Sequence, residues 1–148
     1  MAQHRVTFTL NHLVGELNKS ADRILREEFG LTYSQFLFLV HLGSGGTVSS
    51  SVLAKDMGVS RAAVSKRVSW FTSRGLVRSG HISFDSRVLT LALTSKGTRL
   101  VAQMSNRLEQ RFRERFDSFE EVDLDELNQT LMSILDHLRQ PREDNVAS

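Results

Sequence analysis

The side chains of this sequence that could carry chemistry are hydroxyl and basic groups gathered between residues 60 and 87. No Asp or Glu occurs from Met57 to Phe84. The basic residues of the same stretch are Arg61, Lys66, Arg67, Arg74 and Arg78. Because a positive surface without acidic groups attracts a polyanion, this composition favours nucleic-acid binding over an ordinary solvated helix face.

Catalysis and metal binding find little support in the remaining reactive groups. The histidines are scattered with no close pair: His4, His12, His41, His81 and His137. No nucleophile–base pair, metal motif or phosphate loop stands out. The chain has no cysteine, which excludes disulfides and a thiol switch. We therefore expect no enzyme activity, no cofactor and no metal.

Residues around Gly58 predict the turn of a helix-turn-helix. Gly58 supplies the backbone freedom of a tight turn, and Ser60 can cap the amides of the next helix. In that helix Val64, Val68 and Phe71 recur at helical spacing and predict its buried side. The opposite face carries small and polar residues: Arg61, Ala62, Ser65, Lys66 and Ser69. Such a helix can lie in the major groove of double-stranded DNA and reach base edges.

Further candidate DNA contacts lie on both sides of this helix. The cluster of Ser49, Ser50 and Ser51 could hold a phosphate at the start of the preceding helix, or serve as its cap alone. After Gly75, one strand begins at residue 76, and alternation over residues 88–93 predicts a second. We expect these strands to form a hairpin around a loop from Gly80 to Ser86.

Arg87 lies at the base of the predicted hairpin, where it could reach a phosphate or the minor groove. Asp85 shares its face of the strand and could orient the guanidinium. Alternatively the two residues form a surface ion pair worth under ~1 kcal/mol. The tip of the hairpin carries the apolar residues Ile82 and Phe84.

Long apolar stripes flank this central region. A first helix over about residues 7–28 ends near Gly30, and a capping box of Thr32 and Gln35 opens an apolar helix that ends at Gly43. Thr94 caps a second long helix, and Asp123 opens a last helix that Pro141 ends. Such stripes are typical both of core helices and of dimer interfaces.

Charge is distributed unevenly over the 148 residues, although the net charge is only +2. Ten basic residues face two acidic ones from Lys55 to Arg107, whereas eleven acidic residues face five arginines from Glu109 onward. This asymmetry is typical of a nucleic-acid surface joined to a segment that does not bind. No apolar run reaches the ~18 residues of a membrane span and no signal peptide opens the chain, so we expect a cytoplasmic protein without membrane contact.

The order of these parts resembles the MarR family of bacterial transcriptional regulators. The motifs that carry the resemblance are Leu53-Ala54, Gly58-Val59-Ser60, Val64-Ser65, Arg74-Gly75-Leu76-Val77, Asp85-x-Arg87 and Leu93-Thr94-Ser95-Lys96-Gly97. The resemblance implies one mainly α, α+β domain over residues 1–148. Its expected parts are a winged helix-turn-helix lobe (32–94), dimerisation helices (7–29 and 94–139) and a flexible tail (140–148).

The family resemblance further implies a homodimer that binds a pseudo-palindromic DNA site, commonly as a repressor that a small aromatic ligand releases. Arg61, Ala62, Ser65 and Lys66 would face bases, and Arg87 the minor groove. His12 and Tyr33 are weak candidates for ligand contact. The apolar wing tip departs from the family, whose wing commonly carries Pro and charged residues. A winged helix that binds a protein partner without specific DNA binding is the alternative.

Overall fold

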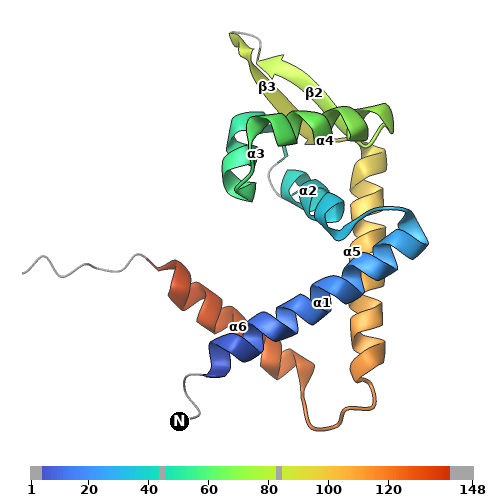
Figure 1. Cartoon of the computed structure of the whole chain (residues 1–148), viewed down its shortest axis with the longest axis vertical. Coiled ribbons are helices and arrows are strands. Elements are labelled where there is room, and N and C mark those ends of the chain that lie inside the picture. Colours follow the sequence, from blue (N-terminus) through green and yellow to red (C-terminus); the bar gives the residue numbers. More distant parts are fainter. Residues whose placement is uncertain (1–4, 44–45, 83–84, 141–148) are drawn as a thin grey trace, which may run out of the picture. The chain divides into compact units, whose positions relative to one another are not determined.

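The computed structural model describes residues 5–43, 46–82 and 85–140. The chain divides into two compact units, Met1–Gln110 and Arg111–Ser148. The elements in chain order are α1 (Val6–Phe29), α2 (Tyr33–Gly43), β1 (Val48–Ser49), α3 (Ser50–Met57), α4 (Arg61–Ser73), β2 (Val77–Ile82), β3 (Asp85–Leu93), α5 (Ser95–Phe116) and α6 (Leu124–Arg139), as labelled in Figure 1. The predicted fold class, a mainly helical winged helix-turn-helix with a small sheet, is confirmed.

Local capping signals set the ends of the first two helices as predicted. Gly30 ends α1 in the left-handed conformation, with φ of 67°. The reciprocal capping box at the start of α2 is present: the Thr32 N–H donates to Gln35 Oε1 (2.8 Å), and the Gln35 N–H donates to Thr32 Oγ1 (3.1 Å). These bonds satisfy amides that a helix start would otherwise leave unpaired.

A single apolar core lies within the first unit. Its largest fully buried side chains include Phe38, Phe71, Leu53, Leu91 and Met104, which come from five different elements. The rings of Phe38 and Phe71 stack with their centroids 5.2 Å apart, which joins α2 directly to α4. Burial of these side chains fixes how α4 is presented at the surface, because its apolar face has only one place to pack.

The small sheet has the strand order β1-β3-β2, and both pairings are antiparallel. The hairpin is longer than predicted: the expected loop from Gly80 to Ser86 is wrong, because β2 continues to Ile82 and β3 begins at Asp85. Backbone pairing explains the difference, since it does not require apolar side chains on a solvated strand. Phe84 at the predicted tip lies outside the described residues.

Thr94 joins the hairpin to the start of α5. Its N–H donates to the Leu76 carbonyl (3.0 Å), and its hydroxyl donates to the Gly75 carbonyl (2.6 Å). The same hydroxyl accepts the Gly97 N–H (3.0 Å), which confirms Thr94 as a helix cap. Gly97 packs so tightly that a Cβ there would lie 2.1 Å from the Leu76 carbonyl oxygen.

The second unit contains the end of α5 and all of α6. The rings of Phe112, Phe116 and Phe119 form a chain with centroid separations of 4.8 and 6.2 Å. Asp123 caps α6 by accepting the N–H groups of Asp125 and Glu126. None of the α6 residues, all of which the structure describes, is buried. Of the predicted tail over residues 140–148, only Gln140 lies within the described residues.

In the described ranges, no helix combines the length and apolar character needed to cross a membrane.

Candidate nucleic-acid interface

The turn between α3 and α4 has the geometry expected of a helix-turn-helix. Gly58 is left-handed, with φ of 62° and ψ of 34°, and its N–H donates to the Lys55 carbonyl (3.1 Å). The Val59 N–H then donates to the Ala54 carbonyl (3.0 Å), which completes the C-terminal cap of α3. Ser60 starts α4 by accepting the Ala63 N–H at its side-chain oxygen (3.1 Å).

Helix α4 has the two faces that its sequence predicts. Val64 and Phe71 are fully buried and Val68 nearly so, and all three belong to the core. The polar face is exposed at all five candidate positions: Arg61, Ala62, Ser65, Lys66 and Ser69. The packing of one face against the core therefore presents the small and basic residues of the other to a partner.

Two basic residues near this face are turned back onto the protein. Arg67 is half-buried; its Nη2 donates to Ser34 Oγ (3.0 Å), and its guanidinium lies 6.0 Å from the Phe38 ring centroid. Arg74 lies over the Trp70 ring at 3.4 Å. These contacts are cation–π and hydrogen-bonding contacts within the lobe, so the two charges contribute to the surface potential rather than to the candidate contact face.

Among the residues of the polar face, Arg61 has a hydrogen bond to a neighbouring helix. Its Nη2 donates to Ser51 Oγ (2.6 Å), which ties the first residue of α4 to the first turn of α3. Ser51 belongs to the serine cluster that the sequence places at the start of α3, but its bond to Arg61 was not predicted. No local signal indicates this bond, because it depends on how the turn at Gly58 brings the two helices together.

The predicted serine contacts lie at the start of α3. Ser49 is its N-cap and accepts the Val52 N–H (3.2 Å), so its capping interpretation is confirmed. Ser50 is the first residue of the helix and is half-buried. Both are near Ser51 in sequence and on the same helical turn, which makes this turn part of the candidate interface.

The hairpin supplies the other predicted contacts. Asp85 and Arg87 both belong to β3, although the predicted loop had included Asp85, and their side chains lie outside the described part of the structure. Arg78 on β2 is an exposed basic residue opposite Ala92 and was not a predicted site residue. Figure 1 shows the hairpin reaching beyond α4, which is the arrangement of a wing beside a recognition helix.

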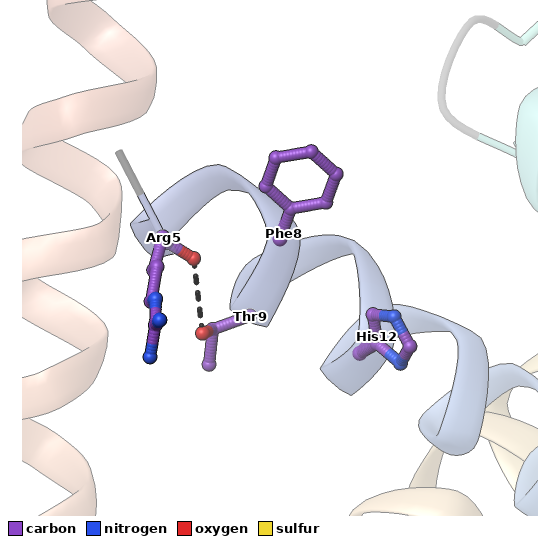
Figure 2. A pocket seen from close by; sticks show the side chains of 4 residues that line it. All are labelled: Arg5, Phe8, Thr9 and His12. Carbon is purple, nitrogen blue, oxygen red and sulfur yellow. Dashed lines mark hydrogen bonds between the residues drawn. The ribbon is translucent and has the colours of Figure 1, made fainter. Parts of the chain in front are cut away.

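A hollow on α1 contains one of the two candidate ligand residues. It measures about 620 Å³ and is lined by Arg5, Phe8, Thr9 and His12, which lie on successive turns in Figure 2. The Thr9 hydroxyl donates to the Arg5 carbonyl (3.0 Å), so it is occupied within the helix. Tyr33 does not line this hollow; it is half-buried and packs 6.1 Å from the Phe36 ring.

Among the described residues, no three His, Asp or Glu side chains are placed together to hold a metal ion.

Comparison with known proteins agrees with this geometry. Residues 29–87 match the sequence model of the MarR family. AbsC, a MarR family transcriptional regulator from Streptomyces coelicolor, is 27% identical over 93% of both chains, with a TM-score of 0.63. A MarR family protein from Bacillus stearothermophilus is 18% identical over 94% of this chain and 96% of its own, with a TM-score of 0.80.

A DNA complex is also among the similar structures. FabT from Streptococcus pneumoniae, solved in complex with DNA, is 19% identical over 92% of this chain and 96% of its own, with a TM-score of 0.70. At this identity the likeness is one of fold. A search of curated protein sequences gives no match.

Proposed function

We propose that this chain is a member of the MarR family of transcriptional regulators, and that it is a sequence-specific, homodimeric DNA-binding repressor that a small aromatic ligand releases. The observation that carries the proposal is the exposed face of α4, which presents Ser65 and Lys66 while Val64, Val68 and Phe71 anchor the helix in the core. A helix anchored in this way can enter a major groove without rearrangement. The FabT–DNA complex shares the fold and supports this use of it.

In the proposed complex, α4 reads bases in the major groove and the hairpin reaches the flanking backbone or minor groove. Arg61, Ala62, Ser65, Lys66 and Ser69 face the DNA. The start of α3, with Ser49, Ser50 and the capping Ser60 nearby, lies against the phosphates. Arg87, with Asp85 to orient it, contacts DNA from the hairpin, because a guanidinium suits phosphates and narrow minor grooves.

The homodimer part of the proposal rests on two unpartnered apolar helix faces. On α1 the exposed side chains include Phe8 (69% exposed) and Val14 (51%). On α6 they include Leu131, Ile134, Leu135 and Leu138. Apolar stripes of this length on water-exposed helices mark association surfaces, and a second copy of the chain supplies the same stripes in return.

The ligand part rests on the hollow along α1. Phe8 offers an apolar surface, and Arg5 and His12 offer groups that bind an anion or a phenol. A ligand seated there acts as a regulator if it favours dimers whose two recognition helices no longer match the DNA half-sites. Tyr33, the first residue of α2, remains a second candidate for ligand contact.

Selection from a random double-stranded DNA library, followed by fluorescence anisotropy on the selected duplex, tests the proposed function. We expect binding about 10³-fold tighter than to a scrambled duplex of equal length. Equal affinity for both duplexes would refute sequence-specific regulation. No DNA binding, together with capture of a discrete protein partner, would favour the interaction-module alternative.

Ligand release is tested on the same selected duplex with a panel of phenols and small aromatic acids. At least one compound is expected to release the wild-type protein, and His12→Ala is expected to reduce that response while leaving affinity for DNA unchanged. Release that is equally efficient with His12→Ala would remove His12 from the ligand site.

A further inference from the structure

Arg61 makes a contact that local helix signals do not explain. Ser49 and Ser60 use their hydroxyl oxygens to cap α3 and α4, respectively. Ser51 lies inside the first turn of α3, and its Oγ accepts the Arg61 Nη2 hydrogen at 2.6 Å. Both side chains belong to exposed residues, so solvent alone would satisfy them. The hydrogen bond therefore sets the direction of the Arg61 side chain, and it is not needed to satisfy a buried polar group.

We propose that Ser51 is a positioning residue that holds the Arg61 guanidinium toward α3, where it contacts a DNA phosphate instead of a base edge. This inference rests on the proposed DNA-binding function and divides the polar face of α4 into two kinds of contact. Arg61 fixes the position of the protein on the DNA backbone. Base discrimination then belongs to Ser65 and Lys66, which lie further along the exposed face.

The geometry of helix-turn-helix binding supplies the physical reason. The first helix of the pair crosses the sugar–phosphate backbone while the second enters the groove. A guanidinium bonded to Ser51 on α3 is therefore held on the side of the unit that faces the backbone. Arginine has five N–H donors, so the bond to Ser51 leaves donors for a phosphate oxygen.

Preorganisation gives the contact an energetic consequence. A free arginine side chain loses rotamer freedom when it binds, and this loss weakens binding. The bond to Ser51 restricts the rotamers of Arg61 in the free protein. The side chain therefore loses less conformational entropy when it binds DNA.

The test measures wild type, Ser51→Ala, Arg61→Ala and the double variant on the duplex selected with wild-type protein, and on its single-base variants. Ser51→Thr retains the hydroxyl. Ser105→Ala is the matched control, because Ser105 is an exposed serine on α5 away from the interface. Circular dichroism and thermal unfolding of each variant verify that it is folded.

Ser51→Ala is expected to weaken binding about three- to tenfold on every duplex, as for the loss of one side-chain hydrogen bond. Arg61→Ala is expected to weaken it more, also uniformly, and to lower the slope of log affinity against log salt by about 1. Ser51→Ala should add nothing in the Arg61→Ala background, and Ser51→Thr should restore binding. Ser105→Ala should bind as wild type.

Three results would overturn the inference. One is an equal loss from Ser51→Ala with and without Arg61, which would show that Ser51 does not act through the arginine. Another is a changed base preference in Arg61→Ala, which would make Arg61 a base reader. The third is wild-type affinity in Ser51→Ala. A wild-type protein that selects no DNA at all would refute the proposed function, an outcome separate from these three.

Discussion

The basic side chains around α4 have different partners within the protein, and these partners determine which of them are available to contact DNA. Arg67 is half-buried against Ser34 and the Phe38 ring, and Arg74 lies on the Trp70 ring. Lys66 is exposed in the middle of the polar face. A count of positive charges therefore overstates the number of groups available to DNA, while it describes the long-range attraction correctly.

Substitutions in the proposed interface separate base reading from backbone contact. Ser65→Ala and Lys66→Ala are expected to change which bases are preferred, because base-edge contacts carry the sequence information. Arg87→Ala is expected to weaken binding to every duplex and to lower the slope of log affinity against log salt by about 1, because it removes one proposed phosphate contact. Anisotropy at several salt concentrations, on the selected duplex and its single-base variants, measures both effects.

Arg23→Ala provides the charge-matched control for these variants, since Arg23 is exposed on α1 outside the proposed interface. It should leave base preference unchanged. A uniform loss on all sequences from both Ser65→Ala and Lys66→Ala would contradict their proposed base-reading contacts.

At the scale of the elements, Gly97 permits the close approach of α5 to the start of the hairpin. Gly97→Ala is expected to destabilise the protein by about 1–3 kcal/mol, because its Cβ would lie 2.1 Å from the Leu76 carbonyl oxygen and the backbone would have to shift. Chemical denaturation measures the loss. Gly80→Ala is the control: its Cβ would lie at an ordinary 3.7 Å from Thr90 Oγ1, and we expect a change within about 0.5 kcal/mol. Equal effects from the two substitutions would contradict this account.

Asp22 connects α1 to the start of α2. It accepts hydrogen bonds from Arg26 Nε (2.6 Å) and from the Tyr33 N–H (2.8 Å). The bond from Arg26, followed by that from the Tyr33 backbone, holds the pKa of this carboxyl below its ordinary value of 3.8. A carboxyl whose pKa is lower in the folded state stabilises that state above its unfolded pKa, and this stabilisation is lost as the pH falls through the folded value.

Asp22→Asn keeps an acceptor for the Tyr33 N–H but removes the charge. It should therefore be less stable than wild type at pH 7, with a difference that shrinks as the pH falls below about 4. Urea denaturation across this range measures the difference. Arg26→Leu, which removes only the larger cause of the pKa shift, should show a smaller pH dependence. A difference between wild type and Asp22→Asn that is constant with pH would contradict the assignment.

Elements whose signals are local could be predicted from the sequence, and contacts that depend on packing could not. Gly30, Gly58 and the Thr32–Gln35 box act within a few residues, so they set helix ends before any tertiary structure forms. The length of the hairpin depends on backbone pairing between β2 and β3. The polar residues at the ends of these strands gave no alternation of apolar side chains from which the pairing could be predicted. The Arg61–Ser51 bond and the tight packing of Gly97 likewise require elements already in place.

At the scale of the whole molecule, α6 has an apolar face without a core of its own. Its Leu131 and Leu135 are 40% and 38% exposed, and none of its residues is buried in the described chain. We expect wild type to be a dimer at micromolar concentration and the doubly substituted Leu131→Asp, Leu135→Asp protein to be a monomer, because paired charges in an apolar interface are costly. Light scattering coupled to size exclusion measures the mass.

Gln129→Asp is the control for the dimer test, since it places a new carboxylate at an exposed polar position of α6. It should remain a dimer. The double variant should also bind the selected duplex more weakly, because a monomer engages only one half-site. A wild-type mass equal to that of one chain would contradict the dimer.

The contacts of Thr94 also determine which segments of the lobe unfold together. Through its bonds to Gly75, Leu76 and Gly97, Thr94 ties together the chain between α4 and β2, the end of β3 and the first turn of α5. None of these segments can separate from the others without breaking the same small set of bonds. Amide hydrogen exchange should therefore detect them as one cooperative unit, in which the amides of Thr94 and Gly97 exchange together and slowly.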